Sequence, residues 1–125
     1  MIKIEAIVRE ERLEDVKSAL QAIEVRGITV SQVMGCGTTM GYVQQVRGRK
    51  VNVNLLPKVK FEIVVSTEEW ANKTIKAIEE AARTGQPGDG KIFCYPIDRA
   101  VRIRTGEEGV EAIQPRTPVI EGEEG

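Results

Sequence analysis

The chain contains no histidine and only two cysteines among its 125 residues. Without histidine it lacks the commonest general base, the commonest zinc ligand and the base that activates serine or cysteine nucleophiles. Cys36 and Cys94 lie far apart and form no C-x-x-C pair, so we interpret them as buried or unreactive thiols in a reducing cytosol. We therefore expect a protein that is not an enzyme, with no catalytic residues and no metal site.

The sequence also lacks a long apolar run and an excess of positive charge. No stretch approaches the length of a membrane span, and Met1 leads directly into an alternating, strand-like pattern instead of a signal peptide. The formal net charge is −1, which gives no basic footprint for nucleic acid. We expect a cytoplasmic protein that does not insert directly into membranes and does not bind nucleic acid.

Apolar residues recur with two periods along most of the chain. Alternation predicts strands at residues 2–9, 28–34, 58–65 and 91–95, the last ended by Pro96, and a short fifth strand at 101–104. Helical spacing predicts one helix at 11–25, stopped by Gly27, and a second that opens with a capping box at 66–69. The apolar face of the second helix is formed by Ala71, Ile75, Ile78 and Ala82. The order of elements predicts an α+β fold of the ferredoxin-like βαββαβ type.

Two helices on one side of such a sheet leave its other face without cover. We expect that face to carry enough isoleucine and valine to pack against another surface. Association with further copies of the chain is the simplest way to cover it. The length of the chain suits one domain with a modest core.

Two segments stand outside the periodic pattern. Residues 36–57 form a connection that is long for a compact domain, which is typical of functional loops, and it carries three cations and no acidic residue. From Glu107 onward the chain holds six glutamates and one arginine, so we expect a disordered acidic tail at 114–125. We therefore divide the chain into a domain at 1–113, which includes a basic effector loop at 36–57, and the tail.

The most distinctive motif is the glycine-rich run TGQPGDGK at residues 84–91. Glycine lets backbone N–H groups approach an anion closely, and Lys91 adds a positive charge. Arg102 and Arg104 follow one residue apart, on the same side of the predicted strand. We interpret these features as a phosphate cradle, with a solvated edge strand as the alternative for the two arginines. The run is not a P-loop, because Ile92 replaces the required serine or threonine and the helix precedes the strand.

These motifs resemble the C-terminal signature of the PII signal-transduction proteins, the nitrogen regulatory P-II family. The resemblance rests on the runs RTGQPGDGKIF at 83–93 and VRIRTGE at 101–107, and agrees with IEAIVR at 4–9, GITV at 27–30, G-x-G at 35–37 and LPKVKFEIVV at 56–65. It covers residues 1–113. It implies a cytoplasmic homotrimer whose sheets face a common axis and which binds ATP or ADP between neighbouring subunits.

The resemblance also assigns the nucleotide site residue by residue. The phosphates would be held by Gly88, Asp89, Gly90 and Lys91, with Gly35, Gly37 and Thr38 beside them. Arg102 and Arg104 would reach the phosphates from the adjacent subunit. The base and ribose would be lined by Ile7, Gly27, Ile28, Thr29, Glu62, Ile63 and Val64.

The long loop departs from the family pattern at the position of Thr39. Relatives that sense 2-oxoglutarate have a glutamine there, which completes a Mg²⁺ shell shared by ATP and the 2-oxo acid, and threonine has no amide oxygen to offer. Gly41 and Lys58, the usual partner of the distal carboxylate, are retained. Part of the 2-oxo acid site is therefore present, which leaves both 2-oxoglutarate binding and a role for Mg²⁺ open.

The same loop lacks the usual sites of covalent modification. Val51 stands where many relatives have a uridylylated tyrosine, and Arg49 stands where others have a phosphorylated serine. Tyr42 is interpreted as a contact residue, with covalent modification of this tyrosine as the alternative, and Arg47 holds the position that relatives insert into an ammonium channel. Together with Lys50, these residues form a surface for a protein target, bound through residues 37–55.

Three hypotheses of function follow from these observations. The first is a trimeric sensor of ATP and ADP that regulates a transporter or a metabolic enzyme through the loop, in nitrogen or in carbon and energy metabolism. The second keeps full 2-oxoglutarate responsiveness and regulates an ammonium transporter or a nitrogen-assimilation enzyme. The third is an enzyme on a ferredoxin-like scaffold that would use Lys58, Glu62 or Asp89 for acid–base chemistry.

Overall fold

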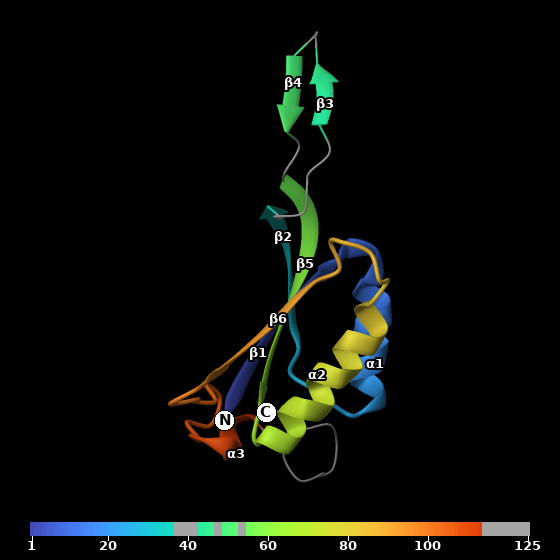
Figure 1. Cartoon of the computed structure of the whole chain (residues 1–125). Helices are drawn as coiled ribbons and strands as arrows, with labels where there is room; N and C mark the ends of the chain where they lie inside the picture. The colour runs from blue at the N-terminus through green and yellow to red at the C-terminus, as the bar shows by residue number, and fades with distance from the viewer. Residues whose placement is uncertain (37–42, 47–48, 53–54, 114–125) are drawn as a thin grey trace.

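The fold is described from a computed structural model, which covers residues 1–36, 43–46, 49–52 and 55–113, with backbone alone for residue 36 and for the ranges 43–46 and 49–52. In chain order the elements are β1 (Ile2–Arg9), the 3₁₀ turn η1 (Glu10–Arg12), α1 (Leu13–Ala22), β2 (Thr29–Cys36), β3 (Val43–Val46), β4 (Arg49–Asn52), β5 (Leu55–Val65), α2 (Glu68–Ala82), β6 (Gly90–Pro96) and α3 (Val110–Ile113). Four strands form an antiparallel sheet in the order β2-β5-β1-β6, and α1 and α2 cover one of its faces (Figure 1). The predicted ferredoxin-like βαββαβ fold is confirmed.

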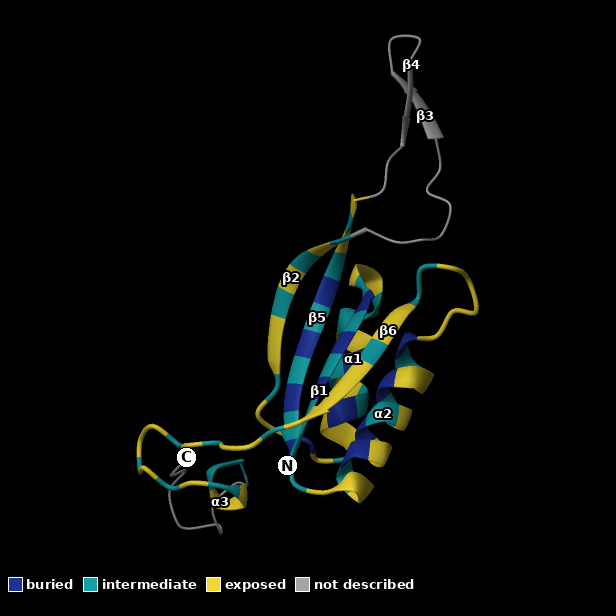
Figure 2. Ribbon diagram, turned by 60° about the vertical axis from the view of Figure 1, so that its left-hand side comes forward, coloured by how far each residue is buried: buried dark blue, intermediate teal, exposed yellow. Residues whose placement is uncertain are grey.

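The core lies between this sheet and the two helices. Alternate residues of β1 and β5 are buried, and the register places Ile4 opposite Ile63 and Ala6 opposite Phe61. Figure 2 shows these buried positions as bands along the two central strands, with α1 and α2 behind them. Burial of such side chains contributes about 1.5–3 kcal/mol each, so the two central strands carry most of the stabilisation of the sheet.

The two helices differ in detail from their prediction. The first begins at Leu13 and ends at Ala22, three residues before the predicted end, because Val25 turns back to donate to the carbonyl of Leu20 and Glu24 takes a left-handed φ of 63°. The second is capped by Thr67, whose hydroxyl accepts from the N–H of Trp70 at 3.1 Å. Tryptophan at that position cannot return a bond to the cap, so the predicted capping box is only half formed.

The connection predicted at 36–57 contains regular structure. β2 and β5 both run into it, since β2 ends at Cys36 and β5 begins at Leu55. Between them β3 and β4 form a separate antiparallel pair, with Val43 opposite Asn52 and Val46 opposite Arg49, which Figure 1 places beyond the ends of β2 and β5. The predicted long connection between the second and third strands of the main sheet therefore contains a strand pair that the sequence pattern did not reveal.

The predicted fifth strand at 101–104 is absent from the described structure. Val101 makes only an isolated bridge with Glu108, and the chain turns back on itself at 102–106. Arg102 accepts from the N–H of Gly106 at 2.7 Å and donates its own N–H to Glu107 at 2.8 Å. Gly106 allows this turn because its φ is 76°. The short α3 that follows was not predicted.

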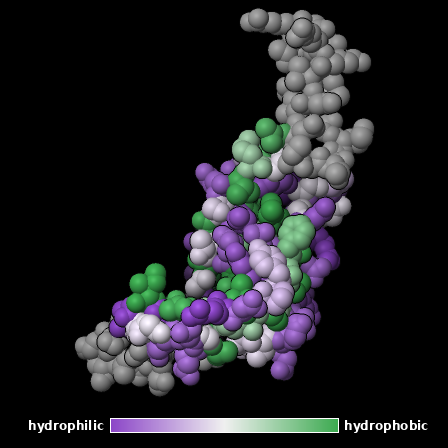
Figure 3. Space-filling model, turned by 90° about the vertical axis from the view of Figure 1, so that its left-hand side faces the viewer, coloured by the Kyte–Doolittle hydropathy of each residue, from purple (hydrophilic) through white to green (hydrophobic). Residues whose placement is uncertain are grey.

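The sheet face opposite the helices is more polar than expected. Its alternate positions hold ion pairs, between Lys3 and Glu62 at 2.8 Å and between Lys60 and Glu5 at 3.7 Å. The Lys3 ammonium also lies 5.6 Å from the centre of the Tyr95 ring. Figure 3, which views this side of the molecule, shows hydrophilic surface with separate hydrophobic areas. The prediction of an isoleucine- and valine-rich face is wrong, because most such residues point toward the helices.

Two further observations complete the fold. Cys94, which was expected to be buried or unreactive, is free and exposed on β6. Desolvation of the sulfur and the nearby charge of Glu68 raise its pKa, which favours the less nucleophilic thiol. Within the described part of the chain, no helix is long and apolar enough to cross a membrane.

Candidate functional site

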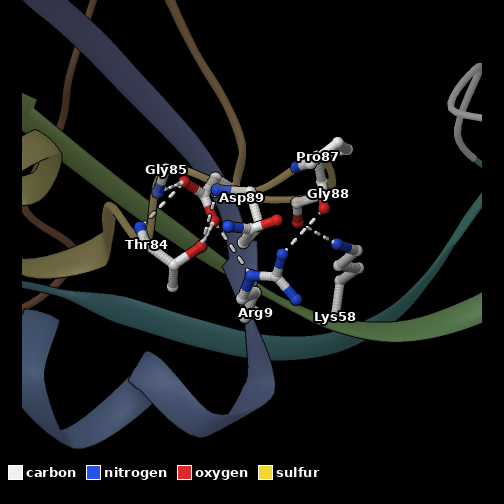
Figure 4. A network of polar contacts seen from close by, with 8 residues as sticks. Arg9, Lys58, Thr84, Gly85, Pro87, Gly88 and Asp89 are labelled. Carbon is white, nitrogen blue, oxygen red and sulfur yellow. Dashed lines mark hydrogen bonds and ion pairs between the residues drawn. The ribbon is translucent and has the colours of Figure 1, made fainter.

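The glycine-rich motif forms a turn that connects the end of α2 to the start of β6. Asp89 organises this turn, because its carboxylate accepts from the N–H groups of Thr84 at 2.8 Å and Gly85 at 2.9 Å, and also from the Thr84 hydroxyl. The Arg9 side chain reaches the same carboxylate from the end of β1, with Nε 2.9 Å from Oδ1 (Figure 4). A carboxylate with this many donors fixes the conformation of the whole turn.

These contacts also determine the protonation state of Asp89. The hydrogen bond from the Thr84 hydroxyl is the largest cause that lowers its pKa, and the bonds from Arg9 and from the N–H groups of Thr84 and Gly85 act in the same direction. Desolvation opposes them but does not prevail, so the pKa of Asp89 lies far below its usual range. The carboxylate is therefore ionised at neutral pH and committed to the turn.

Two glycines in the turn are required by its geometry. Gly90 has a φ of 107°, and a Cβ atom there would lie 1.8 Å from the carbonyl oxygen of Ile7. Gly88 has a φ of 99°, and a Cβ there would approach the Arg9 guanidinium to 3.4 Å. The turn therefore packs directly against the backbone of β1, beside the predicted phosphate contact Lys91.

A second cation holds the turn from β5. Lys58 Nζ donates to the carbonyl oxygen of Gly88 at 2.5 Å, and Arg9 Nη2 donates to that of Pro87 at 2.7 Å (Figure 4). The two cations come together because Arg9 and Lys58 are paired residues in the β1–β5 register. Gly35 on β2 also belongs to this group, since a Cβ there would lie 3.0 Å from the Lys58 side chain.

The structure thus brings part of the predicted site together. Lys91 lies opposite Ile7 in the β1–β6 register, next to the turn. On the helix side of the turn, a groove of about 380 Å³ is lined by Val8, Ile75, Ile78, Glu79, Ala82, Arg83, Asp89, Gly90, Lys91 and Ile92. The cluster formed by Ile7, Gly35, Lys58 and residues 88–91 is the first of three groups into which the predicted residues divide.

The second group lies at the other edge of the sheet. Thr29 on β2 is opposite Glu62 on β5, whose pKa is lowered mainly by the hydrogen bond from Lys3. Gly27 and Ile28 precede Thr29 and line a separate hollow of about 420 Å³ at the end of α1. Because β2 and β6 are the two edges of a four-stranded sheet, they stand three strand spacings apart, which is roughly 14 Å.

Two residues predicted to line the base lie next to Glu62 on β5. Val64 points to the same face as Glu62. The side chain of Ile63 points into the core and is only 1% exposed, so this residue offers a ligand its backbone alone.

The third group is the hairpin at 99–109, which follows β6. The side chain of Arg102 is only 9% exposed and its Nη1 lies 2.9 Å from Glu107 Oε1, whereas Arg104 is exposed. Arg102 and Arg104 therefore differ in environment, contrary to the expectation that a strand would present both on one side. Ile103 between them is 98% exposed.

The remaining predicted residues belong to the long loop. Gly37, Thr38, Thr39, Gly41, Tyr42 and Arg47 lie outside the described residues. Arg49, Lys50 and Val51 lie on β4, of which the backbone is described. Among the residues whose side chains are described, no group of three or more histidine, cysteine, aspartate or glutamate residues is arranged to hold a metal ion.

Sequence reasoning did not assign Arg9 to the site. Its contact with Asp89 spans 80 positions of the chain, which no local pattern reveals. One feature of the sequence points to it afterwards. Arg9 stands at the end of the alternation of β1 and Lys58 at the start of that of β5, and antiparallel pairing of the two strands makes them neighbours on one face.

Comparison with known proteins places this geometry in a family. The family model described as "Nitrogen regulatory protein P-II" matches residues 1–107. Nitrogen regulatory protein P-II 1 of Methanothermobacter thermautotrophicus is 53% identical over 113 residues, which cover 90% of this chain and 97% of that protein. The nitrogen regulatory proteins P-II of Pasteurella multocida and Rhodospirillum rubrum are 49% and 48% identical, over 90% of this chain and 100% of each of those proteins.

The names of these relatives bear on the expected class of function. All three are named as regulatory proteins, which agrees with the expectation of a regulator and not an enzyme. The identities are high and extend over nearly the whole length of both partners in each comparison. The chain belongs to the nitrogen regulatory protein P-II family.

Proposed function

We propose that the chain assembles into a cytoplasmic homotrimer that binds ATP or ADP between neighbouring subunits. The bound nucleotide sets the conformation of the loop at 37–55, through which the protein regulates a transporter or an enzyme of nitrogen or of carbon and energy metabolism. Membership of the P-II family supports the regulatory role. The target itself depends on surfaces that are not part of this chain.

The turn at 84–90 is the observation that carries the proposal. Asp89 holds the turn from inside, Gly90 packs against the backbone of Ile7, and Lys91 follows at the start of β6. The backbone of the turn and the strand position of Lys91 are thereby set before any ligand arrives. A prearranged site of this kind suits the charge of a di- or triphosphate, because little conformational freedom is lost on binding.

The separation of the three residue groups supports assembly. Lys91 and Thr29 lie on strands at opposite edges of one sheet, roughly 14 Å apart by strand spacing. One chain therefore does not bring the glycine-rich turn together with the predicted base contacts Gly27, Ile28 and Thr29. A neighbouring copy that presents its own β2 edge and its own 99–109 hairpin near Lys91 completes the site. We assign the contribution of Arg104 to that neighbour.

Regulation requires that ATP and ADP stabilise different states of the loop by different amounts. Lys58 offers a physical connection, since it bonds the carbonyl of Gly88 in the turn and belongs to β5, the strand that begins at Leu55, at the end of the long loop. A change in the turn on nucleotide binding therefore reaches β5, the strand that directly follows the loop.

Isothermal titration with ATP and ADP tests the proposal. Lys91→Ala and Arg104→Ala should each weaken binding by about tenfold or more, because each removes a charge-assisted contact of about 1.5–3 kcal/mol. Lys17→Ala is the control, since Lys17 is exposed on α1 and paired with Glu14. Sedimentation of the unmodified protein as a trimer is expected in parallel. Unchanged affinities for ATP and ADP in both site variants would refute the site assignment.

A further inference from the structure

Two cations hold two successive carbonyl groups of the turn. Arg9 Nη2 donates to the carbonyl of Pro87 at 2.7 Å, and Lys58 Nζ donates to that of Gly88 at 2.5 Å. Figure 4 shows both side chains approaching the turn, with Arg9 also reaching Asp89. The family resemblance assigns this turn to phosphate binding, but it gives no role to these two contacts with carbonyl groups.

Peptide geometry supplies the reason. The carbonyl of Pro87 shares a planar peptide unit with the N–H of Gly88, and the carbonyl of Gly88 shares one with the N–H of Asp89. In a trans peptide the two groups point in opposite directions, and the described residues contain no cis bond. A side chain that fixes each carbonyl therefore fixes the N–H on the other side of the same plane.

The two N–H groups are available to a ligand. The N–H of Gly88 donates to no acceptor among the residues that the structure describes. The N–H of Asp89 makes only the weak contact with the carbonyl of Gln86 that closes the turn at 87–88, a contact too poor in geometry to compete with a phosphate. By contrast, the neighbouring N–H groups of Thr84, Gly85 and Gln86 are all used inside the turn. The turn thus divides into an inner part held by Asp89 and an outer part whose donors face away from Arg9 and Lys58.

We propose that Arg9 and Lys58 are positioning residues, which aim the N–H groups of Gly88 and Asp89 at the phosphates of a bound nucleotide. The inference rests on the proposed nucleotide site and adds two residues that act on the phosphates through the backbone. Arg9 is the more specific of the two, because its planar guanidinium bonds Asp89 and Pro87 at the same time. An ammonium on a lysine at this position cannot reproduce that paired geometry.

The test combines two measurements on the full-length protein. The first is the backbone amide NMR spectrum without ligand, and the second is the affinity for ATP by calorimetry. The variants are Arg9→Gln, Arg9→Lys and Lys58→Met. The matched controls are Arg12→Gln, which removes an arginine paired with Asp15 three positions further on, and Lys60→Met, which removes the next lysine on the same face of β5.

The expected results separate positioning from simple attraction of charge. Arg9→Gln and Lys58→Met should shift the amide resonances of Gly88 and Asp89 and weaken ATP binding about tenfold, as expected for donors that lose their alignment. Arg9→Lys should weaken ATP binding to a similar degree, although it keeps the charge. Both control variants should retain wild-type affinity and wild-type amide positions for these two residues.

Two results would overturn the inference. One is a set of Gly88 and Asp89 amide resonances that do not move in Arg9→Gln or Lys58→Met. The other is full ATP affinity in Arg9→Lys, which would assign Arg9 a role through charge alone. If the unmodified protein bound no ATP, the proposed function would fail, while the ligand-free spectra would still decide whether the two cations set the turn. Lys58→Met keeps the test decisive if Arg9→Gln does not fold.

Discussion

The turn at 84–90 and the hairpin at 99–109 use the same residue types in different ways. Each contains glycines with positive φ and a carboxylate. Each also has cations predicted to contact phosphate, Lys91 directly after the turn and Arg102 and Arg104 in the hairpin. In the turn, Asp89 accepts from backbone N–H groups and from Arg9, while Lys91 stays outside this network. In the hairpin, Glu107 binds Arg102 itself, with Nη1 and Oε1 2.9 Å apart.

The difference shows how the position of a carboxylate decides what a basic motif offers to a ligand. A carboxylate inside the turn stabilises the backbone and does not pair with Lys91, the cation that is predicted to contact phosphate. A carboxylate five residues after a cation in a tight hairpin pairs with that cation, so a phosphate has to compete for it. In the proposed site, the turn is therefore arranged within one chain before the nucleotide binds, whereas the hairpin has to release Arg102 from Glu107 first.

The largest effect is expected from Gly90→Ala. A Cβ at this position overlaps the carbonyl of Ile7 at 1.8 Å and places alanine at a φ of 107°, so the free energy of unfolding should fall by about 3–5 kcal/mol. Gly85→Ala is the control, because its φ of 88° is also positive but nothing lies within 4 Å of the new Cβ. It should cost about 1–2 kcal/mol. Urea denaturation measures both, and equal losses would show that contact with β1 is unimportant.

The next effect concerns Asp89→Asn. Loss of the charge should lower the free energy of unfolding at pH 7 by about 1.5–3 kcal/mol, since the carboxylate accepts several bonds at once. The folded-state pKa is depressed, so this stabilisation is present above the unfolded pKa of about 3.9 and is lost as the pH falls below it. Wild type and variant should converge in acid. Asp15→Asn, at an exposed ion pair, should change stability by less than about 1 kcal/mol.

A smaller effect is expected for 2-oxoglutarate. Thr39 has no amide oxygen to complete a Mg²⁺ shell, so the unmodified protein with Mg²⁺ and ATP should bind the 2-oxo acid weakly. Thr39→Gln should raise that affinity roughly tenfold, by the order of one charge-assisted hydrogen bond. Calorimetry measures both proteins. Tight binding by the unmodified protein would make the glutamine dispensable here and would favour the 2-oxoglutarate-responsive alternative.

The smallest effect tests the hairpin. Glu107→Gln removes the carboxylate that competes with phosphate for Arg102, so ATP affinity should rise about threefold, within the range of a partly exposed ion pair. Glu108→Gln is the matched control, because its partner Arg99 is not a predicted site residue. A fall in affinity for Glu107→Gln would mean that Glu107 holds Arg102 in its binding orientation, and the contrast with the turn would need revision.

Local patterns in the sequence predicted the fold well. Alternation and helical spacing are set by which side of an element meets the core, so the four strands of the main sheet and the helices α1 and α2 were predicted to within a few residues. The elements that do not pack on this core, β3, β4 and α3, were missed. The polar character of the open face was readable from the same alternation, because Lys3, Glu5, Lys60 and Glu62 occupy the half that points away from the helices. Thr74 was missed: it is fully buried in α2 with its hydroxyl bonded to the carbonyl of Trp70.

The candidate site was predictable only where its residues are close in sequence. The glycines and Lys91 stand in one run, and their chemistry is readable from that run. Arg9 contributes from 78 and 80 positions away, through a register that only the folded sheet defines. Arg102 and Arg104 were assigned to a strand because alternation was assumed, whereas Gly106 and Glu107 close a hairpin.

The central claim is that the turn of one subunit and the hairpin of its neighbour form one nucleotide site. Calorimetry with ATP on mixed trimers, prepared by coexpressing Lys91→Ala and Arg104→Ala chains, tests it most directly. Where an Arg104→Ala subunit supplies an intact Lys91 and a Lys91→Ala neighbour supplies an intact Arg104, a complete site is restored. The account predicts a population of sites with wild-type affinity that neither parent variant has. Mixed trimers in which every site stays weak would contradict it.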